Sequence, residues 1–280
     1  MPPGGLPIGV TLGSLGVDAA WWLDSARRLD AAGYRAVWTW DHFVSKGDRT
    51  TPVLEAWTVL SAAAMVTQRA ALGTFVLNVM NRHPAVLARM AVTLQEASSG
   101  RLRLGLGIGG HEREHEAYGI AFPPARERAD RLREAIAVLR ALWHGGPEDL
   151  DGAHFRLRDA YARPVPQPAP PILVGAQTPA GVRLAAQLGD GWAAEAAFYD
   201  GLAPRYLDAL GAAGRERRDQ LVVLGFGGGR SGEPSLRGSP FVEAPAEAVA
   251  EWQARGVDEV TVTARTTEDV DSLVRAAERW

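Results

Sequence analysis

An acidic and an imidazole side chain are adjacent at Asp41 and His42, in a segment that also contains Trp38 and Trp40. The charge of histidine changes near neutral pH, so a histidine beside a carboxylate can take up and release protons. The alternative is that Asp41 caps a loop and His42 packs. Because the pair follows a predicted strand, we favour catalysis and take both residues as the first catalytic candidates.

Glycines mark a second candidate region between residues 102 and 119. Apolar side chains first alternate with arginine and glycine, which predicts a short buried strand. This strand contains Gly107 and runs into Gly109 and Gly110, before a charged segment that we expect to be a loop. Glycines there indicate that something approaches the backbone closely, and a flat ring or a phosphate would fit. An ordinary glycine-rich turn is the alternative.

A third candidate region joins an apolar strand to a helix that begins at Pro179. Gly175 lets the backbone turn, and Thr178 can cap the helix. Free N–H groups at such a helix start favour a phosphate, although an ordinary capped helix is the alternative. The candidate anion-binding residues are Gly175, Ala176, Gln177 and Thr178.

Several kinds of site lack support in the sequence. His111 and His115 lie four residues apart, a spacing that would put both on one helical face, but no third ligand is evident and the preceding glycines favour a loop. We therefore expect no metal site. There is no cysteine, no G-x-S-x-G and no Walker motif, so covalent hydrolase and nucleotide-hydrolysing arrangements have no support.

Composition narrows the class of partner. The net charge of -3 implies no nucleic acid, and no apolar stretch is long enough to cross a bilayer. The first residues lack the features of a signal peptide, so we expect a cytoplasmic protein that binds a small-molecule substrate. The 280 residues, 46% of them hydrophobic, suffice for a large core.

Apolar strand-like segments alternate with amphipathic helix-like segments along the chain. Eight such pairs in about 250 residues predict an α/β fold, a closed (β/α)8 TIM barrel with insertions in the loops at its C-terminal face. An open doubly wound sheet is the alternative, but its G-x-G-x-x-G fingerprint is absent from the first unit. The expected strands are residues 8–12, 36–40, 71–77, 102–108, 172–174, 191–194, 221–226 and 259–263, and the expected helices are 19–32, 52–66, 84–98, 125–143, 179–188, 203–213, 245–255 and 268–279.

Two stretches interrupt this alternation. Residues 145–171 are rich in proline and predict an extended excursion, such as a hairpin. Residues 227–240 have almost no apolar content, so they form either a mobile lid or a solvated linker. No composition shift marks a boundary, and we expect a single domain over 1–280.

Eight segments of the chain have an order and spacing that are specific in combination. They are residues 32–43, 72–77, 82–89, 93–94, 99–109, 171–175, 189–192 and 256–260. Through these segments the chain resembles the bacterial luciferase-like flavin and deazaflavin oxidoreductases over nearly its whole length. The resemblance implies a barrel with its cofactor at the C-terminal mouth, either F420 for hydride transfer or reduced FMN for monooxygenation.

In the F420 branch an Asp-His pair lies beside the deazaflavin ring, which implies this place for Asp41 and His42. The resemblance also implies a cis peptide bond between Phe75 and Val76 that supports one face of the ring. The implied cofactor-binding residues are Asp41, Thr74, Phe75, Val76, Leu77, Gly107, Gly109, Gly110, Gly175, Ala176, Gln177 and Thr178. Arg82, Arg113 and Arg183 are candidates for the acidic cofactor tail. The expected substrate residues are Gly13, Ser14, Trp40 and Glu195.

Gly110 departs from the pattern of the family, in which an aromatic residue or a glutamate often follows the fourth strand. That glutamate is catalytic in the sugar-phosphate dehydrogenase branch, so its absence speaks against such a substrate and predicts a larger pocket. The Asp-His pair favours F420 over FMN, and a barrel that only binds a ligand is a third alternative. As in relatives, the helix at 125–143 and the excursion after it suggest a homodimer.

Overall fold

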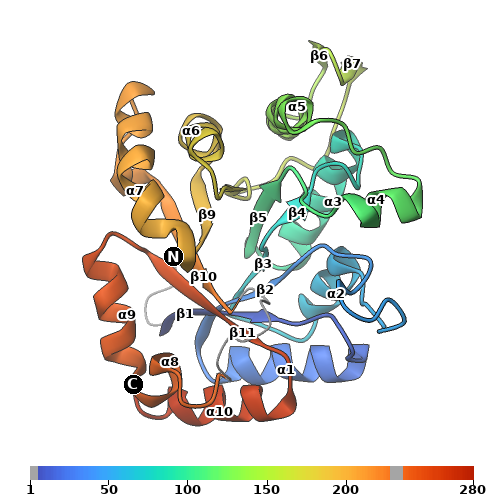
Figure 1. The fold of residues 1–280 in the computed structure, drawn as a ribbon. Helices are drawn as coiled ribbons and strands as arrows, with labels where there is room; N and C mark the ends of the chain where they lie inside the picture. The colour runs from blue at the N-terminus through green and yellow to red at the C-terminus, as the bar shows by residue number, and fades with distance from the viewer. Residues whose placement is uncertain (1–5, 228–235) are drawn as a thin grey trace.

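Residues 6–227 and 236–280 are described in a computed structural model of the chain. Parallel strands lie at its centre and helices surround them (Figure 1). The barrel strands are β1 (Leu6–Leu12), β2 (Tyr34–Thr39), β3 (Ala71–Thr74), β4 (Leu77–Asn78), β5 (Leu102–Gly107), β8 (Ile172–Gly175), β9 (Gly191–Glu195), β10 (Leu221–Phe226) and β11 (Glu259–Ala264).

Hydrogen bonding closes the sheet. The strand order is β3-β2-β1-β11-β10-β9-β8-β5-β4, and β3 also pairs with β5. Because β3 and β4 are two parts of one staggered strand, eight strand positions form a closed parallel barrel, as predicted. The open-sheet alternative is excluded, and all barrel strands end at the same mouth.

The helices pack their apolar sides against the outside of the barrel. On α5 this side consists of buried residues between Leu132 and Trp143, and α5 contacts α3 of the same chain. These contacts lie within one chain, so the expected homodimer stays a prediction. The helices are α1 (Ala19–Ala31), α2 (Ala56–Ala63), α3 (Pro84–Ala97), α4 (Glu112–Tyr118), α5 (Ala125–Trp143), α6 (Pro179–Leu188), α7 (Ala196–Ala212), α8 (Pro240–Glu243), α9 (Pro245–Ala254) and α10 (Thr267–Ala277), with a 3₁₀ turn at Arg217–Asp219.

A tryptophan fills the inside of the barrel. The Trp38 side chain is fully buried, and a Cβ atom added at Gly73 would lie 2.1 Å from its ring. One added at Gly9 would lie 2.5 Å from its Nε1 atom. Glu259 accepts the Nε1–H hydrogen bond at 2.9 Å and also pairs with Arg103, so the indole nitrogen is satisfied. These contacts give the floor beneath the barrel mouth a fixed shape.

Several predicted boundaries were wrong. The helix expected at 52–66 covers only 56–63, because Glu55 accepts the N–H groups of Trp57 and Thr58 and thereby caps its start. The strand expected at 71–77 divides into β3 and β4 around the cis Phe75–Val76 bond, which the family resemblance predicted.

Three further segments test the sequence prediction. The segment after Gly110 is not a loop throughout, because α4 covers 112–118. Helix α7 begins at 196 rather than 203 and continues through Pro204. The excursion contains the predicted hairpin, formed by β6 (Glu148–Asp151) and β7 (Arg156–Ala160). Residues 228–235 of the predicted lid or linker lie outside the described residues.

Candidate active site

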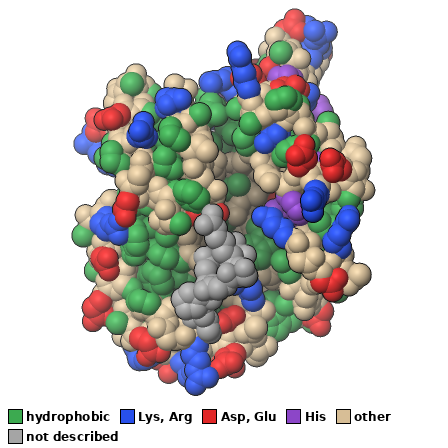
Figure 2. Space-filling view, in the orientation of Figure 1, with side chains coloured by type: hydrophobic (Ala, Val, Ile, Leu, Met, Phe, Trp, Pro, Cys, Tyr) green, Lys and Arg blue, Asp and Glu red, His purple; other side chains and the backbone are tan. Residues whose placement is uncertain are grey.

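A cavity of about 880 Å³ lies at the C-terminal ends of β2, β4, β5, β8 and β9, where α5 and α6 also line it. Figure 2 shows a hollow on this side of the molecule, bordered by hydrophobic and by basic side chains. The cavity brings together the predicted residues Trp40, Asp41, His42, Phe75, Val76, Leu77, Gly107, Gly109, Gly110, Gly175, Ala176, Gln177, Thr178 and Glu195.

Among the described helices, none has the length and apolar character that crossing a membrane requires.

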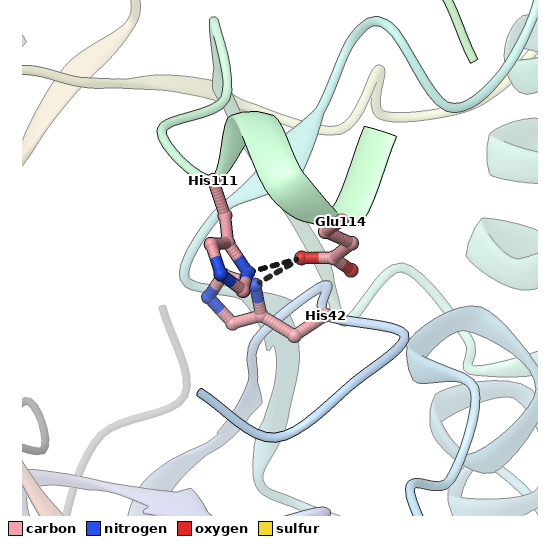
Figure 3. Close-up of side chains that lie close together, drawn as sticks. All are labelled: His42, His111 and Glu114. Atoms are coloured by element: carbon pink, nitrogen blue, oxygen red, sulfur yellow. Dashed lines mark hydrogen bonds and ion pairs between the residues drawn. The ribbon is translucent and has the colours of Figure 1, made fainter. Parts of the chain in front are cut away.

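The His42 imidazole pairs with Glu114 rather than with Asp41. Its Nδ1 atom lies 3.0 Å from Oε2 of Glu114, a residue on α4 (Figure 3). The backbone N–H of Phe43 donates to the other carboxylate oxygen. The His42 side chain is 36% exposed and the Glu114 side chain only 5%, so a buried carboxylate orients a ring that borders the cavity.

Glu114 keeps its negative charge despite burial. Burial alone would raise the pKa of Glu114. Hydrogen bonds from His42, the Phe43 backbone and His111 outweigh this effect, so the pKa lies below its ordinary value. His111 Nδ1 lies 3.1 Å from the same Oε2 atom that His42 contacts. An ionised carboxylate accepts from both rings, which holds a proton on each Nδ1 and leaves each Nε2 available.

The Asp41 carboxylate has a different set of partners. It accepts two hydrogen bonds from the Arg82 guanidinium at 2.7 and 3.0 Å, one from the backbone N–H of Asn78 at 3.0 Å and one from the Asn81 amide at 3.1 Å. Its side chain is 1% exposed. The predicted pairing of Asp41 with His42 is therefore not present, and Asp41 instead anchors the loop that follows β4.

Two of the three arginines proposed for the cofactor tail lie elsewhere. Arg82 is buried between Asp41 and Glu55, and these two carboxylates raise its pKa although burial opposes the shift. Arg113 is exposed but does not line the cavity. Arg183 does line it, together with two arginines of α5 that the prediction did not include, Arg126 and Arg133.

Most of the predicted glycines make room for the protein itself. A Cβ atom added at Gly107 or Gly175 would lie within 2.7–2.8 Å of the Val76 side chain, which the bulge after β3 places over both strands. A Cβ at Gly109 would meet the Asn78 amide. Gly110 differs, because no atom of the described residues lies within 4 Å of its added Cβ. The expected enlargement of the pocket at Gly110 therefore agrees with the structure.

Thr74 does not line the cavity. Its hydroxyl donates to the Gly105 carbonyl at 2.8 Å and accepts from the Gly105 N–H at 3.0 Å, and the residue is fully buried. It joins β3 to β5 at the bulge, where the two strands stop pairing regularly. We assign Thr74 to the support of the platform formed by Phe75 and Val76.

The start of α6 faces the cavity, as expected for an anion site. Thr178 caps the helix by accepting the Gly181 N–H at 3.1 Å. The Ala176 carbonyl accepts from Trp192 Nε1 at 2.9 Å, which fixes the turn after β8. The Gln177 side chain donates a hydrogen bond to Glu195 at 2.7 Å, which holds Glu195, a predicted substrate residue, at the edge of the cavity.

A smaller cavity of about 480 Å³ shares five wall residues with the first, namely Trp40, His42, Lys46, Phe75 and Glu195. Gly13 and Ser14 were predicted here, but both are buried and neither lines it. Thr11 and Leu15, which lie on either side of these two residues in the sequence, line it instead. Phe226 and Arg265 are further wall residues.

Sequence reasoning missed Glu114 as a site residue because it treated 111–119 as a loop. The local pattern offered little signal, because the two buried residues of α4, Glu114 and His115, are both polar. His115 has a different partner from His111: its Nε2 lies 2.6 Å from Asn78 Nδ2, and burial lowers its pKa. The two histidines noted at helical spacing therefore have separate partners.

Comparisons with known proteins agree with this geometry. Over 165 residues the chain is 38% identical to the F420-dependent glucose-6-phosphate dehydrogenase of Beutenbergia cavernae, a match covering 58% of this chain and 48% of that relative. Over 172 residues it is 36% identical to the F420-dependent hydroxymycolic acid dehydrogenase of Mycobacterium tuberculosis, covering 61% and 48%. The matched part thus spans about half the length of these two curated relatives.

One solved structure covers 98% of both chains with a TM-score of 0.82 and 18% sequence identity. It is an F420-dependent secondary alcohol dehydrogenase in complex with an F420-acetone adduct, and at this identity the likeness concerns the fold. The family model described as luciferase-like monooxygenase matches residues 8–227. The predicted family is confirmed: this chain belongs to the luciferase-like monooxygenase family.

Proposed function

We propose that this chain is an F420-dependent oxidoreductase that acts on a small organic substrate. The observation that carries the proposal is the His42 imidazole, which Glu114 holds through Nδ1 so that the ring borders both cavities. Curated relatives that match over more than half of this chain are named as F420-dependent dehydrogenases, which supports the choice of cofactor.

The residues of the larger cavity fit a flat ring that carries an acidic tail. About 880 Å³ is within the range of cofactor sites, and Phe75 and Val76 form an apolar platform beside the open space at Gly110. Arg126, Arg133 and Arg183 stand on the same wall, and none has an ion pair within the described residues. We assign the phosphate to the turn at residues 175–178 and the tail carboxylates to these arginines.

F420, when bound, supplies hydride transfer at C5 of its deazaflavin ring. The protein must then manage one proton on the substrate, and His42 is placed for this role. Because Glu114 accepts a hydrogen bond from Nδ1–H of His42, the Nε2 atom of neutral His42 can take a proton from an alcohol. The carboxylate then stabilises the imidazolium that forms. In the reducing direction the same imidazolium returns the proton.

The smaller cavity is the proposed substrate site. Its walls combine apolar Leu15 and Phe226 with the cations Lys46 and Arg265, and His42 lies where the two cavities meet. This lining suits a small alcohol, or a molecule with a carbon–carbon or carbon–nitrogen double bond. Gly110 stands where sugar-phosphate dehydrogenases of the family carry a glutamate, so we do not assign glucose 6-phosphate as the substrate.

Cofactor binding and turnover test the proposal separately. Titration of the purified chain with F420 and with FMN, followed by ligand fluorescence, is expected to show tight binding of F420 alone. The His42→Ala variant is expected to bind F420 normally and to lose turnover by about 10²–10⁴-fold. His144→Ala is the matched control, since its side chain is 76% exposed and does not line either cavity. Tight binding of FMN without F420 would replace the proposal by a flavin monooxygenase, and full turnover by His42→Ala would remove His42 from the reaction.

A further inference from the structure

We propose that His42, His111 and Glu114 form a binding site for a divalent transition-metal cation of the zinc class, and that an ion bound there inhibits the enzyme. The sequence led us to expect no metal site, because no third ligand was evident beside His111 and His115 and the preceding glycines favoured a loop. The structure adds His42, which lies 72 residues from Glu114 along the chain. The inhibitory part rests on the proposed role of His42 in proton transfer, whereas the binding site itself does not.

The three ligand atoms are close to the arrangement that zinc requires. His42 Nδ1 and His111 Nδ1 lie 3.0 and 3.1 Å from Glu114 Oε2. One possible ligand atom from each of the three residues lies within 4.8 Å of those of the other two. In a tetrahedral zinc site with bonds of about 2.0–2.1 Å, neighbouring ligand atoms are about 3.3 Å apart. The two nitrogen–oxygen separations therefore need to change by only a few tenths of an ångström.

The surrounding backbone holds this set in place. His111 is the residue just before α4 and Glu114 lies in the first turn of that helix, so their separation is fixed by helical geometry (Figure 3). The Phe43 N–H donates to the other oxygen of Glu114, which leaves Oε2 directed at the two rings. Hydrogen bonds of this kind to a ligating carboxylate are what orient it toward a metal.

The chemistry of the set also suits a cation. Two imidazoles and one carboxylate make a three-ligand site, and a single carboxylate oxygen of Glu114 faces both rings. The side chains of His42 and His111 are 36% and 20% exposed and both border the larger cavity. An ion can therefore enter from the cavity and keep a water molecule as a fourth ligand.

Binding of the ion would change the state of His42. The Nδ1–H bonds to Glu114 must give way, since a ligating nitrogen carries no proton. Neutral His42 then keeps its proton on Nε2, where it can donate but cannot accept. The residue that takes the substrate proton would be blocked, so occupancy of the site by a cation and turnover would exclude each other.

Zinc binding to protein dialysed against a chelator, measured in competition with a chromophoric chelator, tests the site. We expect one Zn²⁺ per chain, and a loss of affinity of more than about 10-fold in His111→Ala and in Glu114→Gln, with no change in the exposed control His144→Ala. Co²⁺ in place of Zn²⁺ should give a visible absorption band that His111→Ala removes. Circular dichroism confirms that each variant is folded, and His111→Ala decides the question if Glu114→Gln is not.

Zinc binding that is absent, or that His111→Ala leaves unchanged, would overturn the inference. F420 binding is measured on the same metal-free protein, so it can succeed while the zinc site fails. If zinc binds at this site but does not slow turnover, the inhibitory part is wrong and the binding site stands.

Discussion

Replacement of Asp41 by asparagine distinguishes an anchoring role from a chemical one. Asp41 accepts four hydrogen bonds, two of them from the Arg82 guanidinium, and its side chain is 1% exposed. In Asp41→Asn the one amide oxygen can keep the three bonds made to Oδ2, so the Arg82 bond to Oδ1 is lost and the other three become bonds to a neutral acceptor. At roughly 1.5 kcal/mol for the lost bond and about 0.5 kcal/mol for each weakened one, the free energy of unfolding falls by about 3 kcal/mol. Glu55 still pairs with Arg82, which keeps the cost below that of a fully unpaired buried charge.

Thermal and urea unfolding of the two proteins measure this loss, which corresponds to a lower melting temperature by roughly 6–12 °C. Asp24→Asn is the matched control, because Asp24 pairs with Arg27 on the surface and its side chain is 52% exposed. We expect the control to change stability by less than about 1 kcal/mol.

The kinetics of Asp41→Asn decide between the two roles. If Asp41 anchors the loop, the folded variant keeps the pH dependence of kcat, while Glu114→Gln alters that profile. If Asp41→Asn keeps the stability of the parent and yet shifts the pH profile of kcat, Asp41 is a chemical partner of His42 and our assignment is wrong.

Three further predictions concern the glycine beside Trp38 in the barrel, the Glu114 carboxylate and the arginines that line the larger cavity. Gly73→Ala places a methyl group 2.1 Å from the Trp38 ring and should destabilise the fold by about 1–3 kcal/mol or more. The control Gly201→Ala lies inside α7, where an added Cβ meets nothing within 4 Å, and should stabilise the fold slightly. Equal melting temperatures for the two variants would contradict this account. The pKa of Glu114 is lower in the folded protein than its ordinary value of 4.5, so the ionised carboxylate stabilises the fold above pH 4.5. This contribution is lost as the pH falls through the pKa of the folded state. The difference in unfolding free energy between the parent and Glu114→Gln should therefore shrink from pH 7 to pH 3. A constant difference across that range would show that Glu114 is not preferentially ionised in the fold. Arg183→Ala should weaken F420 binding and reduce its salt dependence, while Arg113→Ala, which lies outside the cavity, should leave both unchanged. Equal effects of the two arginine variants would mean that the tail does not follow this wall.

The sequence predicted the barrel well because its signals are local. Alternating strands and helices are visible in the order of apolar residues, and the turns at Gly175 and Pro179 follow from the conformations that glycine and proline allow. Boundaries were less certain where a side chain at a distance decides them. Helix α2 starts late because Glu55 caps it, and the same Glu55 is held by Arg82 from another loop.

The glycines illustrate a different limit. Their presence indicated a close approach to the backbone, which is correct, but at Gly107 and Gly175 the approaching group is Val76 of this chain. A pattern in one strand cannot say which neighbour fills the space above it. Among the four glycines predicted to bind the cofactor, Gly110 alone has open space where a side chain would begin.

The sequence by itself determined the closed barrel and the mouth at which its strands end, because both follow from periodicity. It also singled out His42 as a candidate by residue type. Only the tertiary structure decided which carboxylate serves His42. Asp41 and His42 follow the end of β2 and have different partners, since Asp41 pairs with Arg82 while His42 pairs with Glu114. The barrel then brings Glu114 to His42 from 72 residues along the chain, and such a contact arises from the closing of the sheet rather than from any local pattern.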